Sequence, residues 1–191
     1  MINKMPKEQD KKMKVVIVEK LSEEQEKAVS ALQKLAFTGV SDEEVEEDFY
    51  HPKSAQVLAY IGKELVGWAG IHETEQEFER KKIKLGGYGI CTHPNWQRKG
   101  VARKVSQAAM DFLKDKGCEV AFLSVEPSNL ASIKLHQKNG FVMLPRDFSW
   151  TNSKGKVKQS DGGMIAPVNS KELFEHILNG KEVLYVGNGY W

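Results

Sequence analysis

The sequence predicts an α/β fold of the α+β type, in which one domain holds a central mixed β-sheet flanked by helices. Two observations predict this class. Residues 55–61 and 65–71 are apolar strands on either side of a short turn, which is typical of an antiparallel hairpin. Residues 83–125 then follow the order strand, helix, strand, a crossover that makes its two strands parallel. The chain has 191 residues, enough for one domain with a full core.

The segments before the hairpin predict a tail, a strand and two helices. Residues 1–13 are polar and charged, which favours a disordered tail, and the β-branched residues 14–19 predict a first strand. Ser22 starts a capping box, so a helix follows. Its core-facing residues recur at helical spacing: Ala28, Leu32, Leu35 and Ala36. A second, short helix is expected between Ser41 and Pro52.

The crossover comes after the hairpin and a polar loop. We expect its first strand at residues 83–92, its helix at 100–116 and its second strand at 120–125. Gly117 ends the helix, because a glycine readily adopts the left-handed conformation that often follows a last helical turn.

The C-terminal part adds a helix, a strand and an extension. A helix at residues 130–138 and a strand at 141–144 complete a core of residues 14–144. The extension, residues 145–191, is expected to contain a polar loop at 153–162. A strand, a helix and a last strand follow this loop, at residues 164–168, 171–178 and 183–186.

Composition excludes several classes of function. The formal net charge of +2 is too small to predict nucleic-acid binding, and the charges are mixed in sign. The first apolar run, residues 15–18, is too short for a signal sequence or a membrane span. Two cysteines, Cys91 and Cys118, predict buried free thiols in a reducing compartment. We therefore expect a cytoplasmic protein without nucleic-acid or membrane partners, and leave open whether it forms a homodimer.

The turn into the helix at residues 100–116 has the features of an anion site. The first N–H groups of a helix lack partners within it and carry the positive end of its dipole. Gly100 allows a ligand to approach the backbone closely, and Ala102 is the next smallest choice. Positive side chains surround the turn, at Arg98, Lys99, Arg103 and Lys104. An ordinary turn between a strand and a helix would explain the same residues, so the turn alone leaves both interpretations open.

Two short motifs lie at a characteristic spacing. The first, Gln/Arg-x-x-Gly-x-Gly/Ala, is matched by Gln97, Gly100 and Ala102. The second, Asn-x-x-Ala/Ser-x-x-Leu-Tyr-x-x-x-Gly-Phe, is matched by Asn129, Ser132, Leu135, Gly140 and Phe141. Together they resemble the GNAT superfamily of acetyl-CoA-dependent N-acetyltransferases. The resemblance implies a GNAT fold with a splayed sheet, an acyltransferase activity and one N-acetyltransferase domain over residues 14–191.

This resemblance also implies acetyl-CoA as co-substrate and no metal. Backbone amides of the first motif would hold the pyrophosphate of coenzyme A, at Gln97, Arg98, Lys99, Gly100, Val101 and Ala102. The pantetheine would lie along Ile90, Cys91 and Thr92, and a bulge at residues 86–89 would part this strand from its neighbour. Cys91 has a second interpretation, as a nucleophile that carries the acyl group.

Asn129, Ser132 and His136 stand three and four residues apart, so they share a helix face that should look toward the coenzyme. His136 occupies the position where the family usually has a tyrosine that protonates the leaving thiolate. An imidazolium can donate that proton; alternatively, His136 bonds only a backbone carbonyl or water. The general base is open among Glu126, Asp161 and the α-carboxylate of Trp191.

The acceptor is expected to be a primary amine, on a small molecule or a peptide, that attacks the thioester directly in a ternary complex. The C-terminal tail resembles that of aminoglycoside 2'-N-acetyltransferases, in which the terminal carboxylate and nearby acids meet the polyamine. By position, that resemblance suggests Asp161 and Trp191 as substrate contacts. A coenzyme A-binding regulatory module with little or no turnover is the alternative function.

Overall fold

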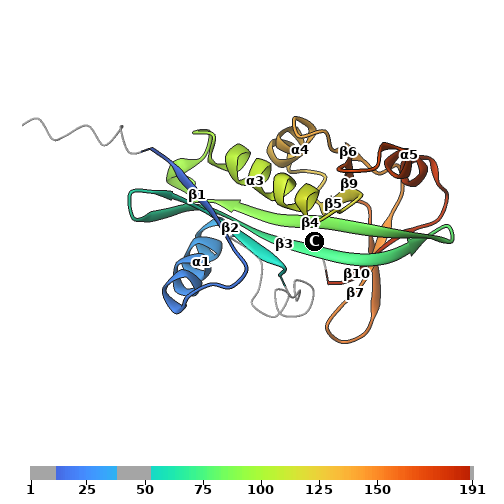
Figure 1. The fold of residues 1–191 in the computed structure, drawn as a ribbon, viewed down its shortest axis with the longest axis horizontal. Coiled ribbons are helices and arrows are strands. Elements are labelled where there is room, and N and C mark those ends of the chain that lie inside the picture. The colour runs from blue at the N-terminus through green and yellow to red at the C-terminus, as the bar shows by residue number, and fades with distance from the viewer. Residues whose placement is uncertain (1–11, 38–52, 190–191) are drawn as a thin grey trace, which may run out of the picture.

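The computed structural model describes residues 12–37 and 53–189, and its centre is a seven-stranded mixed sheet (Figure 1). The strands stand in the order β1-β2-β3-β4-β5-β9-β6. Their bounds are β1 (Lys14–Val18), β2 (Ala55–Ile61), β3 (Glu64–Phe78), β4 (Lys81–Thr92), β5 (Val120–Ser124), β9 (Gly163–Pro167) and β6 (Val142–Met143). A smaller sheet has the order β10-β7-β8. Its strands are β10 (Leu184–Asn188), β7 (Phe148–Thr151) and β8 (Val157–Ser160).

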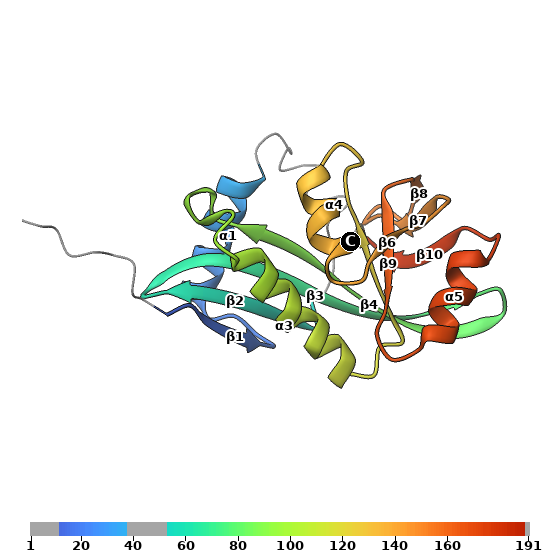
Figure 2. The same cartoon turned by 90° about the horizontal axis from the view of Figure 1, so that it is seen from above.

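Helices cover both faces of the main sheet. The longer helices are α1 (Glu23–Ala36), α3 (Val101–Asp115), α4 (Leu130–Gln137) and α5 (Lys171–Asn179), and a short 3-10 helix, η2 (Pro94–Trp96), precedes α3. α3 and α4 cover one face, whereas α1 and the smaller sheet lie on the other (Figure 1). Seen from the first face, α3 and α4 lie next to each other above the strands (Figure 2). The predicted mixed sheet flanked by helices is therefore confirmed.

Each face of the sheet has its own apolar core. α3 packs on its face through the stripe Val101, Val105, Ala109 and Leu113, all buried. α1 packs on the opposite face through Val29 and Leu32. Two predicted pairings are confirmed here: β2 and β3 form the antiparallel hairpin, and β4 and β5 pair in parallel across α3.

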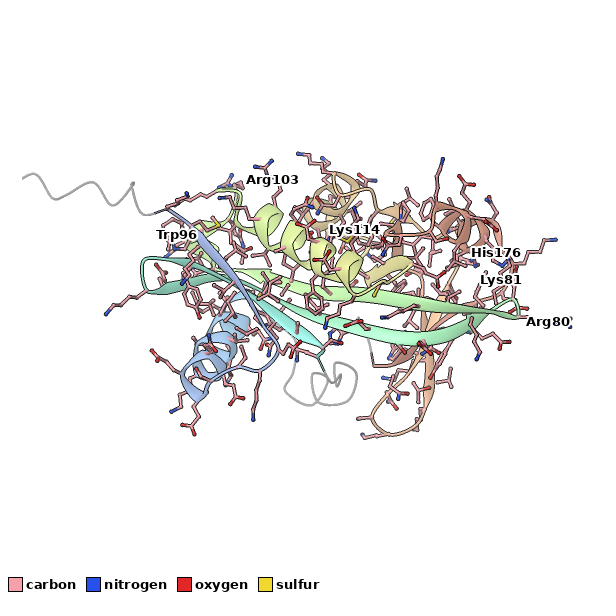
Figure 3. All side chains as sticks on the ribbon, in the orientation of Figure 1. Arg80, Lys81, Trp96, Arg103, Lys114 and His176 are labelled. Atoms are coloured by element: carbon pink, nitrogen blue, oxygen red, sulfur yellow. The ribbon has the colours of Figure 1, made fainter. Side chains whose placement is uncertain are left out.

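The predicted polar loop after the hairpin is wrong, because β3 and β4 continue through it as one long hairpin. Their pairing runs without interruption from Gly67–Thr92 to Phe78–Lys81. Glu79 and Arg80 form the two-residue turn with φ of 44° and 66°, and Figure 3 shows Arg80 and Lys81 at its tip. The charged residues of this segment suit an exposed strand face, since Glu and Lys stand opposite each other across the two strands.

The predicted polar loop at residues 153–162 is also wrong in part. Residues 157–160 form β8, which pairs with β7, and β7 itself was not predicted. β7 buries Phe148 and Trp150 in a third apolar cluster that joins the smaller sheet to β5 and α5. The strand predicted at residues 183–186 is confirmed as β10, which pairs in parallel with β7. The helix expected between Ser41 and Pro52 and most of the expected tail lie outside the described residues.

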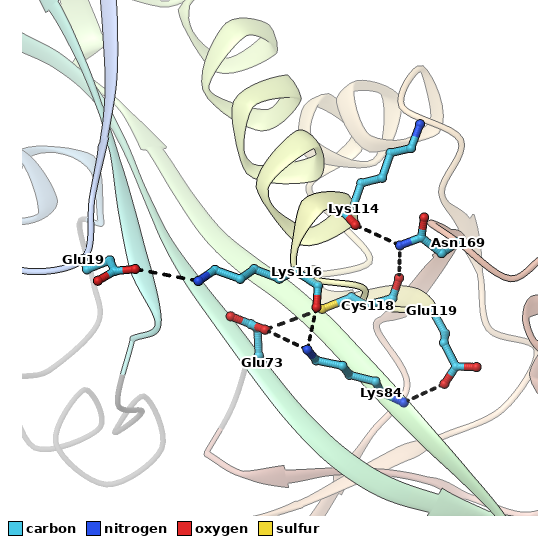
Figure 4. A network of polar contacts seen from close by, with 8 residues as sticks. All are labelled: Glu19, Glu73, Lys84, Lys114, Lys116, Cys118, Glu119 and Asn169. Carbon is cyan, nitrogen blue, oxygen red and sulfur yellow. Dashed lines mark hydrogen bonds and ion pairs between the residues drawn. The ribbon is translucent and has the colours of Figure 1, made fainter.

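A polar network fixes the C-terminal end of α3 (Figure 4). The side-chain amide of Asn169 donates to the carbonyl oxygens of Lys114 and Cys118, over 3.0 and 2.8 Å. Lys84 Nζ donates to the carbonyl oxygen of Lys116 over 2.6 Å. These bonds add side-chain donors to carbonyl groups in the last turn of α3 and just after it. The C-terminal end of α3 is therefore held by β4 and by the segment that precedes α5.

Candidate active site

The start of α3 has no side-chain cap. Its N-cap residue is Gly100, and the first hydrogen bond back to Gly100 comes from the N–H of Lys104. By contrast, side-chain oxygens of Ser22, Asn129 and Ser170 cap α1, α4 and α5. Among these four helices, α3 alone therefore begins with N–H groups that no capping side chain binds. A helix start of this kind binds anions.

The turn before α3 leaves room for a ligand. Gly100 has a φ of +82°, which favours glycine, and a Cβ at this position would have no described atom within 4 Å. Arg98 has a φ of +60°, a conformation that costs a non-glycine residue roughly 1–2 kcal/mol and that clusters at ligand-binding turns. Gly100 is thus required for its backbone conformation, and open space lies beside it.

Positive side chains surround this turn. Four exposed residues supply them: Arg98, Lys99, Arg103 and Lys104. Lys99 Nζ lies 4.6 Å from the centre of the Trp96 ring. Figure 3 shows Trp96 and Arg103 at this end of α3 and Lys114 toward its other end. The charge therefore gathers where the helix amides are free, an arrangement that suits a polyanionic ligand.

β4 and β5 separate at the end of the sheet that lies next to this turn. Their pairing consists of Leu85–Val120, Gly86–Ala121 and Gly87–Phe122, although β4 runs on to Thr92. Backbone groups of residues 88–92 that face β5 therefore have no ladder partner in that strand. The predicted splay is confirmed. The predicted bulge is wrong, since residues 86–89 pair with β3 without any shift of register.

The Cys91 side chain faces α1 rather than α3. It is buried in the apolar cluster that holds Leu32 and Trp68, on the opposite side of the sheet from α3. Burial raises the pKa of the Cys91 thiol to about 12. The thiol therefore stays protonated at neutral pH and lacks the thiolate that a nucleophile needs.

His136 lies in a buried cluster between α4, α3 and β4. Its side chain is 2% exposed, and its ring centre is 5.7 Å from that of Tyr88 and 5.6 Å from that of Phe141. Its Nδ1 atom is 3.4 Å from the Tyr88 hydroxyl. Burial lowers the pKa of His136 to about 4, so the ring is neutral at pH 7. The imidazolium that the sequence suggested is the minor form.

This lowered pKa makes the stability of the fold depend on pH. An unfolded histidine gains its proton near pH 6.5, whereas folded His136 gains it near pH 4, so stability is lost as the pH falls through this window. At pH 5 the loss is about 2 kcal/mol. In urea unfolding, we expect the stability difference between pH 8 and pH 5 to be about 2 kcal/mol smaller for His136→Gln than for the wild type. Equal differences in the two proteins would contradict the lowered pKa.

Three residues that sequence reasoning missed connect His136 to α3. The Tyr88 hydroxyl is 2.5 Å from Ser106 Oγ, and the Asn139 side-chain amide donates to the same Oγ over 2.6 Å. Ser106 follows Val105 on the buried side of α3 and is itself fully buried. A polar residue at such a position needs a hydrogen-bond partner, and this signal was available in the sequence.

The remaining predicted site residues lie at more exposed places. Asn129 Oδ1 accepts from the N–H of Ser132 over 3.1 Å, which leaves the NH2 of Asn129 as the donor for a ligand. Glu126 is exposed just after β5, and Asp161 is exposed between β8 and β9. Trp191 lies outside the described residues.

Within residues 12–37 and 53–189, no helix is long and apolar enough to cross a membrane. The same ranges contain no group of three or more His, Cys, Asp or Glu residues that could hold a metal ion. Cys91 and Cys118 are both buried and free, as predicted.

The uncapped start of α3 lies at the open end of two parting parallel strands, a place in such sheets where anionic ligands bind. The model of the acetyltransferase (GNAT) family matches residues 22–141, and the chain belongs to this family. The resemblance that rested on the two motifs is therefore confirmed.

Relatives of known structure share the fold. The ribosomal-protein-S18-alanine N-acetyltransferase of Escherichia coli matches with a TM-score of 0.57 and 18% identity, over 81% of this chain and 94% of that one. A putative acetyltransferase of Salmonella typhimurium, solved with its cofactor acetyl-CoA, matches with a TM-score of 0.56 and 16% identity, over 82% and 94%. At these identities the likeness shows the fold, and the predicted GNAT fold is confirmed.

A relative in sequence matches a shorter part of the chain. The chain is 38% identical over 56 residues to the L-amino acid N-acyltransferase MnaT of Escherichia coli (strain K12). The match covers 29% of this chain and 33% of that protein, so the chain spans about a third of the length of this relative.

Proposed function

We propose that this protein transfers the acetyl group of acetyl-CoA to a primary amine. The observation that carries the proposal is the uncapped start of α3 at the open end of β4 and β5. The first-turn amides and the open space at Gly100 fit a pyrophosphate, and the unpaired backbone of residues 90–92 fits the amides of pantetheine. The names of the similar proteins, an N-acyltransferase and N-acetyltransferases, support the same activity.

Each part of the site then has a defined role. Backbone amides of residues 98–102 hold the pyrophosphate, since the Gln97 N–H already donates to the Pro94 carbonyl oxygen. The neighbouring Arg98 and Lys99 balance the charge of the pyrophosphate. The main chain of residues 90–92 holds the pantetheine, and one of its N–H groups polarises the thioester carbonyl. The Asn129 NH2 and the Ser132 hydroxyl contact the coenzyme from α4. Acetyl-CoA supplies an activated acetyl group, and no metal takes part.

The acceptor is an amine on a small molecule or a peptide that attacks the thioester directly. The protonated, α1-facing thiol of Cys91 supports direct attack over an acyl-enzyme. His136 stabilises the leaving thiolate, and Asp161 and the α-carboxylate of Trp191 are our candidates for groups that meet the amine. We further propose that the protein works in the cytoplasm, where its two free thiols stay reduced. Whether it does so as a monomer or a homodimer would be measured by sedimentation.

Two measurements test the activity. Coenzyme A at a concentration far above its Kd should raise the melting temperature, because a ligand that binds only the folded state stabilises it. Acetyl-CoA should then release thiol above background with at least one amine from a panel of L-amino acids, N-terminal peptides, polyamines and aminoglycosides. Binding without release for every amine would favour the regulatory module, and absence of binding would refute the proposal.

Direct transfer predicts that Cys91 is dispensable for the chemistry. We expect Cys91→Ala to keep kcat within about threefold of the wild type, with some loss of stability from the buried site. Cys118→Ala, which removes the other buried thiol, is the matched control. Intact-mass measurement after incubation with acetyl-CoA alone should show an unmodified chain. An acetylated Cys91 that disappears on addition of amine would instead show an acyl-enzyme.

A further inference from the structure

We propose that the Tyr88 hydroxyl, held by Ser106 and Asn139, is a positioning group that keeps the proton of the neutral His136 ring on Nε2. This N–H is then the donor offered to the leaving sulfur. The position of the proton is argued from the hydrogen bonds of this cluster, whereas the identity of the sulfur rests on the proposed function.

The direction of the hydrogen bonds runs from Asn139 to His136. A side-chain amide nitrogen only donates, so Asn139 donates to Ser106 Oγ. The Ser106 hydroxyl can donate a hydrogen bond to the Tyr88 oxygen, 2.5 Å away. Tyr88 then donates to its other neighbour, Nδ1 of His136, at 3.4 Å. A ring nitrogen that accepts carries no proton, so the neutral imidazole is protonated on Nε2.

Burial makes this arrangement of protons stable. Tyr88 is 1% exposed, and burial raises the pKa of its hydroxyl to about 12, so the phenol keeps its proton. A buried hydroxyl needs an acceptor within the protein, because an unsatisfied polar group costs free energy. Ser106 Oγ already accepts from Asn139, and Nδ1 of His136 is the second acceptor within reach of the Tyr88 hydroxyl.

The cluster sits at the inner end of the splay. Tyr88 is the first residue of β4 after the last pair with β5, Gly87–Phe122. Ser106 lies five residues after the first residue of α3, about 8 Å farther along the helix axis. The anion-binding turn marks the outer end of the same path. A ligand that is held at the turn and follows β4 inward therefore reaches His136 at its far end.

The reaction explains why the tautomer matters. When the amine attacks, the N–C bond forms, the C–S bond breaks and the sulfur leaves with the electron pair. The proton lost by the nitrogen ends on the sulfur, directly or through water. An Nε2–H donor stabilises the negative charge on sulfur without giving up its own proton. The opposite tautomer would present a lone pair to the sulfur and would repel it.

The tautomer is measured on the whole protein, labelled with 15N at histidine, by long-range 1H–15N correlation at neutral pH. The signals of His136 are identified by their loss in His136→Gln. We expect the Nε2–H pattern in the wild type and a shift toward Nδ1–H in Tyr88→Phe, which keeps the ring and removes the hydroxyl. Tyr185→Phe is the matched control and should leave the pattern unchanged, since it removes a hydroxyl bonded to Thr151 over 2.8 Å in the smaller sheet.

Kinetics separate positioning from packing. With an amine that the protein acetylates, Tyr88→Phe should lower kcat about tenfold, while the KM for acetyl-CoA and the Kd for coenzyme A change less than twofold. Ser106→Ala should act in the same direction, and it replaces Tyr88→Phe if that variant fails to fold.

The outcomes distinguish this proposal from the proposed function. An Nδ1–H tautomer or a charged His136 ring in the wild type refutes the proposal. An unchanged tautomer of His136 in both Tyr88→Phe and Ser106→Ala refutes it as well. A changed tautomer with unchanged kcat refutes the positioning role. If no amine is acetylated, the proposed function fails, and the spectrum still decides where the proton of His136 lies.

Discussion

Ala102→Glu is expected to weaken coenzyme A binding about a hundredfold while leaving the fold as stable as before. Ala102 lies in the first turn of α3, where an acidic side chain stabilises a helix by roughly 0.3–1 kcal/mol. The same carboxylate would stand close to a bound pyrophosphate. Two like charges about 4 Å apart repel by about 1 kcal/mol in water and about 4 kcal/mol at a partly buried site. Isothermal titration with coenzyme A and urea unfolding measure the two effects separately.

The matched control for this substitution is Ala31→Glu. Ala31 is exposed on α1, which covers the opposite face of the sheet, and the new carboxylate would stand four residues after Lys27. This variant should bind coenzyme A with wild-type affinity. If folded Ala102→Glu binds coenzyme A with a Kd within threefold of the wild-type value, the start of α3 is not the anion site.

Phe122→Ala is expected to lower the free energy of unfolding by about 3–5 kcal/mol. The Phe122 side chain is fully buried, and its ring centre lies 4.8 Å from that of Phe148 in the smaller sheet. Phe122 also pairs with Gly87 in the last rung between β4 and β5. Its removal leaves a cavity at the point where the two sheets meet and the splay begins. Urea unfolding at 25 °C measures the loss, which is a large part of the 5–15 kcal/mol typical of a domain.

Phe122→Leu is the control that keeps most of the side-chain volume. It should cost roughly 1–2 kcal/mol, because a well-packed ring is replaced by a smaller apolar group. If Phe122→Ala and Phe122→Leu cost the same, the cavity would not be the cause of the loss, because leucine leaves much less empty volume than alanine.

Elements with strong periodicity were predicted closely from the sequence. The strand expected at residues 55–61 is β2, and the helix expected at residues 100–116 is α3. The wrong predictions concern strands that are rich in charged or polar residues or are very short. The two-residue turn at Glu79 and Arg80 lacks the usual glycine or asparagine, so the long hairpin gave no turn signal. β7 is only four residues long, and its partner β8 is largely polar.

The candidate site was predictable in its position but not in the state of its side chains. Local patterns sufficed for the turn at residues 97–102, because a helix start and a glycine are adjacent in sequence. The neutrality of His136 depends on burial in the folded protein, where Tyr88, which is 48 residues away in the chain, lies against the ring. The face of the sheet that Cys91 lies on also depends on how β4 is placed in the folded protein. Successive side chains of a strand point to opposite faces, and the predicted bounds of this strand did not show which face α1 covers.

The two ends of α3 differ in their hydrogen bonding. This difference gives a way to detect bound coenzyme A without knowing the amine substrate. Amide hydrogens in the first turn, from Val101 to Arg103, have no intrahelical acceptor and should exchange with solvent deuterium quickly in the free protein. Those near Leu113 are bonded in a helix end that Asn169 and Lys84 hold in place, and should exchange slowly throughout. Coenzyme A should therefore slow exchange at one end of a single helix only, which would map the bound anion directly.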